Sequence, residues 1–335
     1  MTTPSTDWKE VIAPGEAELF EKLAAQLGAL QSSLAQKNDG LKRGLHAKVN
    51  VITRATFEVK SDVPEHLRVG PFATAGKKYD AVVRFSNGGP IVQGDKKPDV
   101  RGMAVKLLGV GGKKIIPGMQ DAQTQDFSAI LSTSVPFPSP EAFIWFVIAA
   151  RSPLTLLPKA FMKFGIGATL KLVKTLQAGL GAPVMQLHTN RYFTPLPIRL
   201  GAYAAKYSFT PVGAQNVKST ADNVGAELST YLEGNDAKWD FQVQLFTDET
   251  NTPLEDHTRD WNGPWVTLGT LTIPKQSTGS AEGQKLSAWG EKLSFDPWHA
   301  CEELRPLGAM MRARSPAYRV STQARGASPE PTELP

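Results

Sequence analysis

The order of the secondary-structure patterns along the chain restricts the fold more than any other feature. Alternating or β-branched runs at 49–59, 80–86 and 102–108 predict strands, separated by turn-forming residues. A helical pattern then covers about 139–180, and strand patterns return in three further runs: 203–212, 239–247 and 265–273. Strands, then helices, then strands predict an α+β fold in which an antiparallel sheet closes into a barrel with helices around it.

The N-terminal part predicts one amphipathic helix, because leucines recur there at helical spacing: Leu19, Leu23, Leu27, Leu30 and Leu34. We expect residues 1–40 to form an arm and this helix. No linker-like stretch divides residues 41–326, so they form one predicted domain, with a helical insertion at about 139–180. The segment 327–335, rich in Pro and Glu, is predicted to be disordered.

Composition excludes several classes of protein. The 37 Lys and Arg exceed the 32 Asp and Glu by only 5, which is too few to indicate nucleic-acid binding. Cys301 is the only cysteine, so no internal disulfide can form. The first residues lack the pattern of a signal peptide, and the most apolar run, 142–150, is about half the ~20 residues of a membrane span. We therefore expect a cytoplasmic protein.

Residues capable of chemistry gather near the two ends of the predicted domain. His46 lies at the start of the first strand, three residues after Arg43. Near the other end, Tyr318 follows Arg314 by four residues and precedes Arg325 by seven. Taken singly, a strand histidine is more often structural than catalytic, and this Arg–Tyr spacing occurs by chance in many chains. Only the occurrence of both groups of residues in one chain is evidence of a functional site.

Six stretches occur in an order that resembles the haem catalases, and specifically the short catalase-like proteins that keep only the barrel and its helices. The resemblance runs in patches from about 41 to 326, whereas 150–200 matches no part of the family pattern. The patches R-x-x-H-A-K and R-x-x-x-Y-x-x-x-x-x-x-R are the specific ones. The stretches are RGLHAKVNVITRATFEV, AVVRFS, DVRGMAVK, WDFQVQLFTDE, SFDPWH and RSPAYRVSTQAR.

The resemblance implies a haem b cofactor whose iron is bound by Tyr318 as a phenolate. Arg314, one helical turn away, favours that anion. Met310 would pack against the porphyrin, with an ordinary core position as the alternative. Haem carries two propionates into a largely apolar pocket, where buried charge needs partners. The resemblance assigns that task to three arginines: Arg43, Arg84 and Arg325.

On the opposite side of the haem, the resemblance makes His46 the catalytic acid–base, which moves a proton between the two oxygens of a peroxide. Ser86 would fix the orientation of the imidazole. Phe137 would match an aromatic residue of the family on this side, and Phe143 is a second candidate.

One departure from the family concerns the substrate. Catalases place an asparagine where this chain has TQDFSAILSTSVPF at 124–137, with no asparagine and only the candidate hydroxyls of Ser132, Thr133 and Ser134. We therefore expect a peroxidase that acts on organic or lipid hydroperoxides with a small-molecule reductant. The alternatives are a true hydrogen peroxide catalase, an isomerase similar to allene oxide synthases, and a non-enzymatic haem or lipid carrier. Leu45, where allene oxide synthases have threonine, disfavours the isomerase.

A second feature of the sequence can be interpreted without any resemblance to a family. No Asp or Glu occurs between Glu141 and Asp222, although this interval contains nine Lys and Arg residues. Within it, 154–180 is apolar with lysines spaced along it. This composition predicts peripheral contact with an anionic membrane or with lipid, and core helices with a solvated lysine face are the alternative. Whether the chain forms a homodimer is left open.

Overall fold

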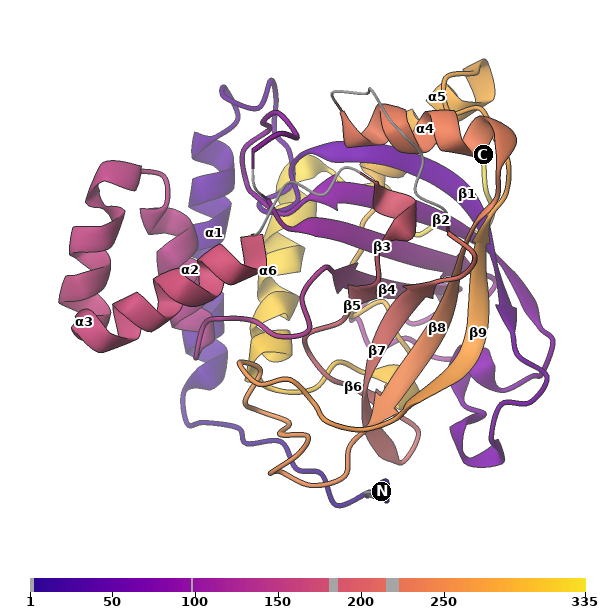
Figure 1. The fold of residues 1–335 in the computed structure, drawn as a ribbon, viewed down its shortest axis with the longest axis horizontal. Coiled ribbons are helices and arrows are strands. Elements are labelled where there is room, and N and C mark those ends of the chain that lie inside the picture. The colour runs from indigo at the N-terminus through magenta and orange to yellow at the C-terminus, as the bar shows by residue number, and fades with distance from the viewer. Residues whose placement is uncertain (1–2, 98, 181–185, 215–222) are drawn as a thin grey trace.

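The computed structural model describes residues 3–97, 99–180, 186–214 and 223–335, and its centre is one antiparallel sheet (Figure 1). The strands are β1 (Val49–Val59), β2 (Lys78–Asn87), β3 (Arg101–Leu108), β4 (Thr124–Ile130), β5 (Tyr192–Phe193), β6 (Ile198–Leu200), β7 (Tyr203–Pro211), β8 (Ala237–Leu245) and β9 (Trp265–Ile273). They follow the order β5-β4-β3-β2-β1-β9-β8-β7-β6, and β5 also pairs with β7. Eight strands therefore close into a barrel, with β6 beside β7, which confirms the predicted antiparallel barrel and its α+β class.

The barrel interior is filled by aromatic side chains, which come from inward-facing strand positions and from Phe72 of the short helix Gly70–Phe72. Phe241 lies at the centre, with its ring centroid 4.9 Å from that of Phe127 and 5.7 Å from that of Phe57. Phe72 and Tyr207 stack on it at 5.3 and 5.4 Å. All five residues are buried. The interior is thus packed here, and the chemistry expected of the chain is found where β1 to β3 face the helices.

Helices cover the outside of the barrel (Figure 1). They are α1 (Glu16–Ser33), α2 (Pro140–Ala149), α3 (Pro153–Leu180), α4 (Val224–Gly234), α5 (Ala281–Lys292) and α6 (Ala309–Arg325). The predicted leucine stripe of α1 faces inward, and Leu23 packs with Ile144 of α2 and Ala313 of α6. Three distant parts of the chain therefore form one layer beside the barrel.

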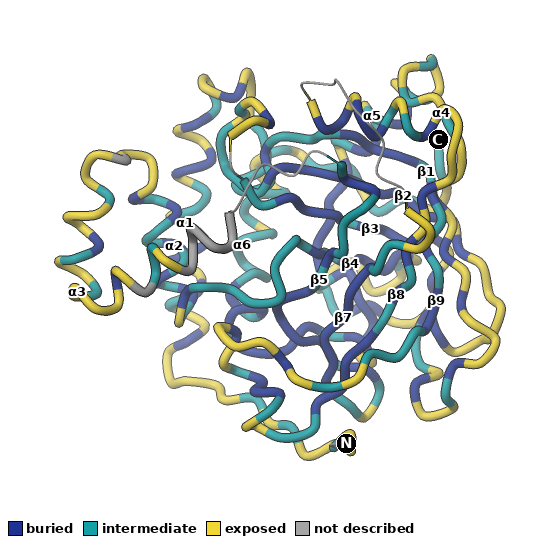
Figure 2. The backbone as a smooth tube through the Cα atoms, in the orientation of Figure 1, coloured by how far each residue is buried: buried dark blue, intermediate teal, exposed yellow. Residues whose placement is uncertain are grey.

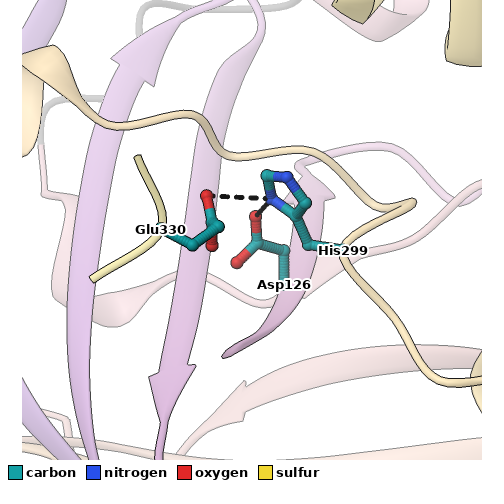
Figure 3. Close-up of side chains that lie close together, drawn as sticks. All are labelled: Asp126, His299 and Glu330. Carbon is teal, nitrogen blue, oxygen red and sulfur yellow. Dashed lines mark hydrogen bonds and ion pairs between the residues drawn. The ribbon is translucent and has the colours of Figure 1, made fainter. Parts of the chain in front are cut away.

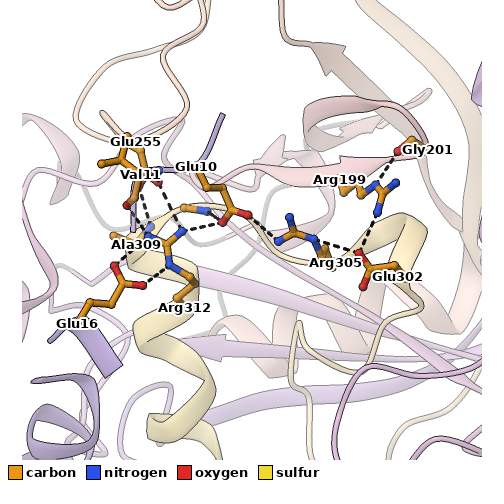
Figure 4. A network of polar contacts seen from close by, with 11 residues as sticks. Glu10, Val11, Glu16, Arg199, Gly201, Glu255, Glu302, Arg305, Ala309 and Arg312 are labelled. Carbon is orange, nitrogen blue, oxygen red and sulfur yellow. Dashed lines mark hydrogen bonds and ion pairs between the residues drawn. The ribbon is translucent and has the colours of Figure 1, made fainter. Parts of the chain in front are cut away.

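The N-terminal arm fixes the start of α6 through a network of ion pairs (Figure 4). The guanidinium of Arg312 lies 2.7 Å from the Glu10 carboxylate and 2.5 Å from that of Glu16. Glu255 accepts a 2.8 Å hydrogen bond from the backbone N–H of Ala309 in the first turn, where a negative charge is favourable. Burial opposes ionisation of Glu10, but its hydrogen bonds and Arg305 lower its pKa overall. The arm thus holds the helix that carries Tyr318.

The prediction of a disordered C-terminal tail is corrected by the structure, in which residues 327–335 pack against the barrel. Glu330 reaches Lys106 and lies 3.3 Å from Nδ1 of His299 (Figure 3). Lys106 also lies 2.7 Å from the Asp126 carboxylate, so its ammonium supplies the positive charge between two buried carboxylates. Leu334 packs on a cluster that includes Ile52. Composition alone could not predict this, because the partners lie far away in the sequence.

Candidate active site

His46 lies just before β1 in a backbone conformation that fixes the direction of its ring. Its φ is 53°, in the left-handed region, which costs roughly 1–3 kcal/mol and persists only where the surrounding structure imposes it. Its N–H donates to the carbonyl of Gly88 at 3.0 Å, and its own carbonyl accepts from Arg84 at 3.0 Å. The strained backbone is therefore held from both sides.

The imidazole of His46 is paired with Ser86. Nδ1 lies 2.9 Å from the Ser86 hydroxyl on β2. On β3, Gly102 is the register partner of Ser86, and a Cβ added there would lie 2.6 Å from the His46 ring. Only glycine leaves room for the ring at this point. Burial, followed by the charges of Arg84, Arg314 and Arg43, lowers the pKa of His46 to about 3. The imidazole is therefore neutral near pH 7.

Tyr318 and Arg314 form the second pair. They lie one turn apart on α6, and Nη2 of Arg314 donates to the phenolic oxygen at 2.7 Å. Burial opposes the charge of Arg314, but the neighbouring Tyr318 more than offsets it and the pKa of the guanidinium is raised. Because the charge of Arg314 also acts on His46, the two pairs lie close together although they are far apart in sequence.

The three arginines assigned to propionates converge on the C-terminal end of α5. Arg43 and Arg84 each place a nitrogen 2.7 Å from the same carboxylate oxygen of Glu291. Arg325 donates to the backbone carbonyls of Glu291 and Leu293 at 3.3 and 3.4 Å. Its Nε is buried without a hydrogen-bond partner in the structure. The cluster therefore gathers three positive charges around one negative charge.

The electrostatics of this cluster reflect the excess of positive charge. Burial, together with the like charge of Arg84, lowers the pKa of Arg43 to about 9. Burial also lowers the pKa of Arg325. Although burial opposes ionisation of Glu291, Arg84 and Arg43 lower its pKa overall, so it stays anionic. With three guanidiniums and one carboxylate, the cluster carries two positive charges that no described acidic side chain balances.

Phe137 lies in the loop between β4 and α2. Its buried ring packs 4.9 Å from that of Phe146 and 5.4 Å from that of Phe143, both on α2. A hydrogen bond from His257 holds the loop in place, with Nε2 2.6 Å from the Phe137 carbonyl oxygen. Burial lowers the pKa of His257, so a neutral ring donates this bond. The position of Phe137 is thus set by a residue that sequence reasoning did not select.

Two of the three hydroxyls considered in place of the family's asparagine have partners within the loop or at the surface. Thr133 donates to Asp260 at 2.6 Å, in an exposed position. Ser132 donates to the carbonyl of Ser134 at 2.8 Å. Met310 is buried in the main core cluster of the barrel. These contacts are the ordinary ones of a loop and a core, so they add no support for a role in the site.

Glu291 and Gly102 are the residues of this site that sequence reasoning missed. Glu291 stands three residues before the SFDPWH patch and Gly102 lies inside the DVRGMAVK patch. Both residues had a signal in the sequence. Glu291 is a charged residue close to a matched stretch, and Gly102 is a small residue within one. Neither role follows without the three-dimensional arrangement that brings Arg43 to α5 and His46 to β3.

Comparison with known proteins agrees with this architecture. The chain matches no family model. Over 300 residues it is 28% identical to a catalase-related peroxidase of Mycolicibacterium paratuberculosis, covering 84% of this chain and 88% of that protein. Its structure is similar to a fungal catalase (TM-score 0.64), a bacterial catalase (0.65) and catalase A from Saccharomyces cerevisiae (0.66), each at 16% identity.

The similarity to the three catalase structures covers 97%, 98% and 97% of this chain, but only 65%, 63% and 67% of theirs. The chain therefore spans about two thirds of their length. The fold is that of the catalases. The sequence is similar to a catalase-related peroxidase, and together with the fold this confirms the resemblance seen in its motifs.

Proposed function

We propose that this protein is a haem-dependent hydroperoxidase that reduces or decomposes peroxides, with organic or lipid hydroperoxides as its substrates. The observation that carries the proposal is the buried arginine cluster, whose two uncompensated positive charges lie near the Arg314–Tyr318 pair and the neutral His46. The similarity to a catalase-related peroxidase supports an oxidoreductase of this class.

The residues present fit haem b. Its two propionates carry two negative charges, which would balance the cluster of Arg43, Arg84, Arg325 and Glu291. The buried Nε of Arg325 would gain an acceptor, and unpaired buried donors are costly. Tyr318 would hold the iron, with Arg314 stabilising the phenolate. When bound, haem b would supply a ferric iron that an anionic oxygen ligand maintains in that state and that assists O–O cleavage.

The chain would contribute the proton transfer. A neutral His46 can accept the proton from one peroxide oxygen and return it to the oxygen that leaves. The 2.9 Å contact with Ser86 and the strained backbone at His46 fix the ring, so the base is held in place before substrate arrives.

The choice of substrate rests on the loop at 124–137. A catalase must hold a second hydrogen peroxide molecule while oxidising it, and this loop has no asparagine for that purpose. Its aromatic contact with α2, through Phe137, favours an apolar substrate. A true catalase remains the second candidate because of the catalase fold. Leu45 disfavours an allene oxide synthase, and the His46–Ser86 pair disfavours a carrier, which needs no acid–base.

The test is a titration of the purified protein with hemin, followed by turnover. We expect a ferric high-spin spectrum, and faster use of cumene hydroperoxide with a reductant than dismutation of hydrogen peroxide. A protein that takes up no hemin would contradict the proposal. Vigorous oxygen release from hydrogen peroxide would instead support the true catalase.

Glu291→Gln tests the charge balance of the cluster. Removing the carboxylate leaves Arg43 and Arg84 without their counter-ion, and breaking a buried pair typically costs about 3–5 kcal/mol. Since the Glu291 side chain is 28% exposed, we expect the haem-free protein to lose about 1–3 kcal/mol of its unfolding free energy. The haem-loaded protein should lose less, because propionates then face the arginines. Urea unfolding of both forms measures this.

Glu58→Gln is the matched control, because it removes the same charge from an exposed ion pair with Lys78. It should change the unfolding free energy by no more than about 1 kcal/mol in either the haem-free or the haem-loaded protein. An equal loss of stability in the haem-free and haem-loaded forms of Glu291→Gln would contradict the proposed charge balance.

A further inference from the structure

Helix α3 exposes large apolar side chains to solvent. It stands out from the barrel, beyond α1 and α2 (Figure 1). Most of its described length is exposed or half-buried (Figure 2). Five apolar residues are exposed by nearly half or more: Leu154 95%, Met162 87%, Ile166 69%, Leu170 57% and Leu157 46%. Single exposed apolar residues are common, but a group of them marks a contact surface.

The first half of α3 arranges these residues in a row. Leu154, Pro158 and Met162 follow at four-residue spacing and are all exposed, so they lie along one face of the helix. Ala160, on the opposite face, is buried. The apolar face that points outward is therefore not the one that packs on the protein.

The second half of α3 repeats the arrangement after a break. Gly165, with φ 78° and ψ 169°, interrupts the helix in a conformation that favours glycine. Beyond it, Ile166, Leu170 and Lys174 again follow at four-residue spacing and are exposed. Thr169, beside this row, is buried. The break lets two short helical segments each present one outward row.

Lysines accompany both rows. Lys159 and Lys163 are exposed and directly follow Pro158 and Met162 in the sequence. Lys174 is the last residue of the second row. No acidic residue occurs between Glu141 and Asp222 to neutralise them. Apolar side chains flanked only by lysines are typical of a helix that lies at the surface of an anionic membrane.

We propose that α3 is a docking surface for an anionic lipid bilayer, with its apolar rows buried at the headgroup boundary and its lysines among the headgroups. No helix in the described ranges has the length and apolar character to cross a membrane, so this contact is peripheral. A second copy of the chain fits less well. In a two-fold interface the same patch meets itself, which would place lysine against lysine, and lysine is depleted at interface cores.

The docking surface leads toward the candidate site, a point that rests on the proposed function. Phe164 of α3 packs edge-on against Trp145 of α2 at 5.0 Å. One residue further along α2, Phe146 contacts Phe137 at 4.9 Å. Neighbouring residues of α2 therefore contact α3 and the Phe137 loop, which links the proposed membrane surface to that loop. The substrate class that this placement favours is a hydroperoxide of a membrane lipid.

Co-sedimentation of the haem-loaded protein with vesicles tests the docking. We expect binding to vesicles of phosphatidylcholine and phosphatidylglycerol in equal parts, but little to phosphatidylcholine alone, and weaker binding as salt rises. Each lysine near an anionic surface strengthens binding about five-fold. The combined variant Lys159→Gln, Lys163→Gln and Lys174→Gln should therefore bind about 10²-fold more weakly.

The matched control removes three exposed lysines elsewhere, with the same change in net charge: Lys60→Gln, Lys275→Gln and Lys285→Gln. It should still bind. A second variant, with Leu154, Met162 and Ile166 changed to serine, should also lose binding, because apolar burial is part of the contact. Wild-type protein that stays in the supernatant at low salt would overturn the proposal. So would a loss of binding equal in control and test variants.

Two further measurements separate the outcomes. If the serine variant changes the oligomeric state in sedimentation velocity without vesicles, α3 is a self-association surface and the membrane proposal fails. Turnover of water-soluble cumene hydroperoxide tests the proposed function independently of docking. If the protein docks but does not turn over cumene hydroperoxide, the proposed function is contradicted and the docking proposal is not. If both hold, the lysine variant should lose turnover of phospholipid hydroperoxide in vesicles while retaining that of cumene hydroperoxide.

Discussion

The Tyr318→Phe variant is expected to bind hemin at least about 10²-fold more weakly than the wild type and to lose its ferric high-spin spectrum. Changing even the outer partners of a metal ligand typically costs about 10–100-fold in affinity, and the phenolic oxygen would be the ligand itself. Arg314→Ala should have a smaller effect, about tenfold, because it removes only the 2.7 Å hydrogen bond to that oxygen. Hemin titration followed by absorbance measures both.

Tyr203→Phe serves as the control, since this partly buried tyrosine lies at the start of β7, where its ring contacts His66. Its hemin affinity should match the wild type. Because phenylalanine keeps the packing of Tyr318, circular dichroism should show an unchanged fold. A Tyr318→Phe protein with unaltered hemin affinity and spectrum would refute the assignment of the ligand.

The second large effect is expected for His46→Ala. The haem content should stay near that of the wild type, but hydroperoxide turnover should fall by about 10²–10⁴-fold, the usual contribution of a positioned acid–base. The wild-type pH profile gives a separate readout. Because the pKa of His46 is lowered to about 3, its imidazole stays neutral across pH 5–8 and kcat/KM should show no acid limb near the ordinary histidine pKa of about 6.5.

His66→Ala is the matched control, because His66 is exposed in the short helix Glu65–Leu67 that follows β1, where its ring contacts Tyr203. It should leave turnover unchanged. Retained turnover in His46→Ala, or an acid limb near pH 6.5 that disappears with His46→Ala, would show that His46 is either unnecessary or not held neutral by burial and the arginines.

The strand pattern and the Arg–Tyr pair could be predicted because their signals are local. Alternation along β1 is contained in adjacent residues, and Arg314 meets Tyr318 because they lie one helical turn apart. Glu291 could not be assigned, since its partners Arg43 and Arg84 are 248 and 207 residues away. The tail was predicted wrongly for the same reason. Its composition is mostly Pro and polar residues, yet Glu330 is held by a lysine 224 residues away.

The closure of the barrel has a consequence for how the chain folds. The ring depends on β5, in which Phe193 pairs with Ile130 of β4 while both Tyr192 and Phe193 pair with β7. Between β4 and β5 lies the insertion that carries α2 and α3, so this contact closes a long loop and bears its entropic cost. Contacts of this kind slow folding and are made late. The ring is therefore closed by a short strand, and we expect its few backbone pairs to open before those of the longer strands, although the Tyr192 side chain is fully buried.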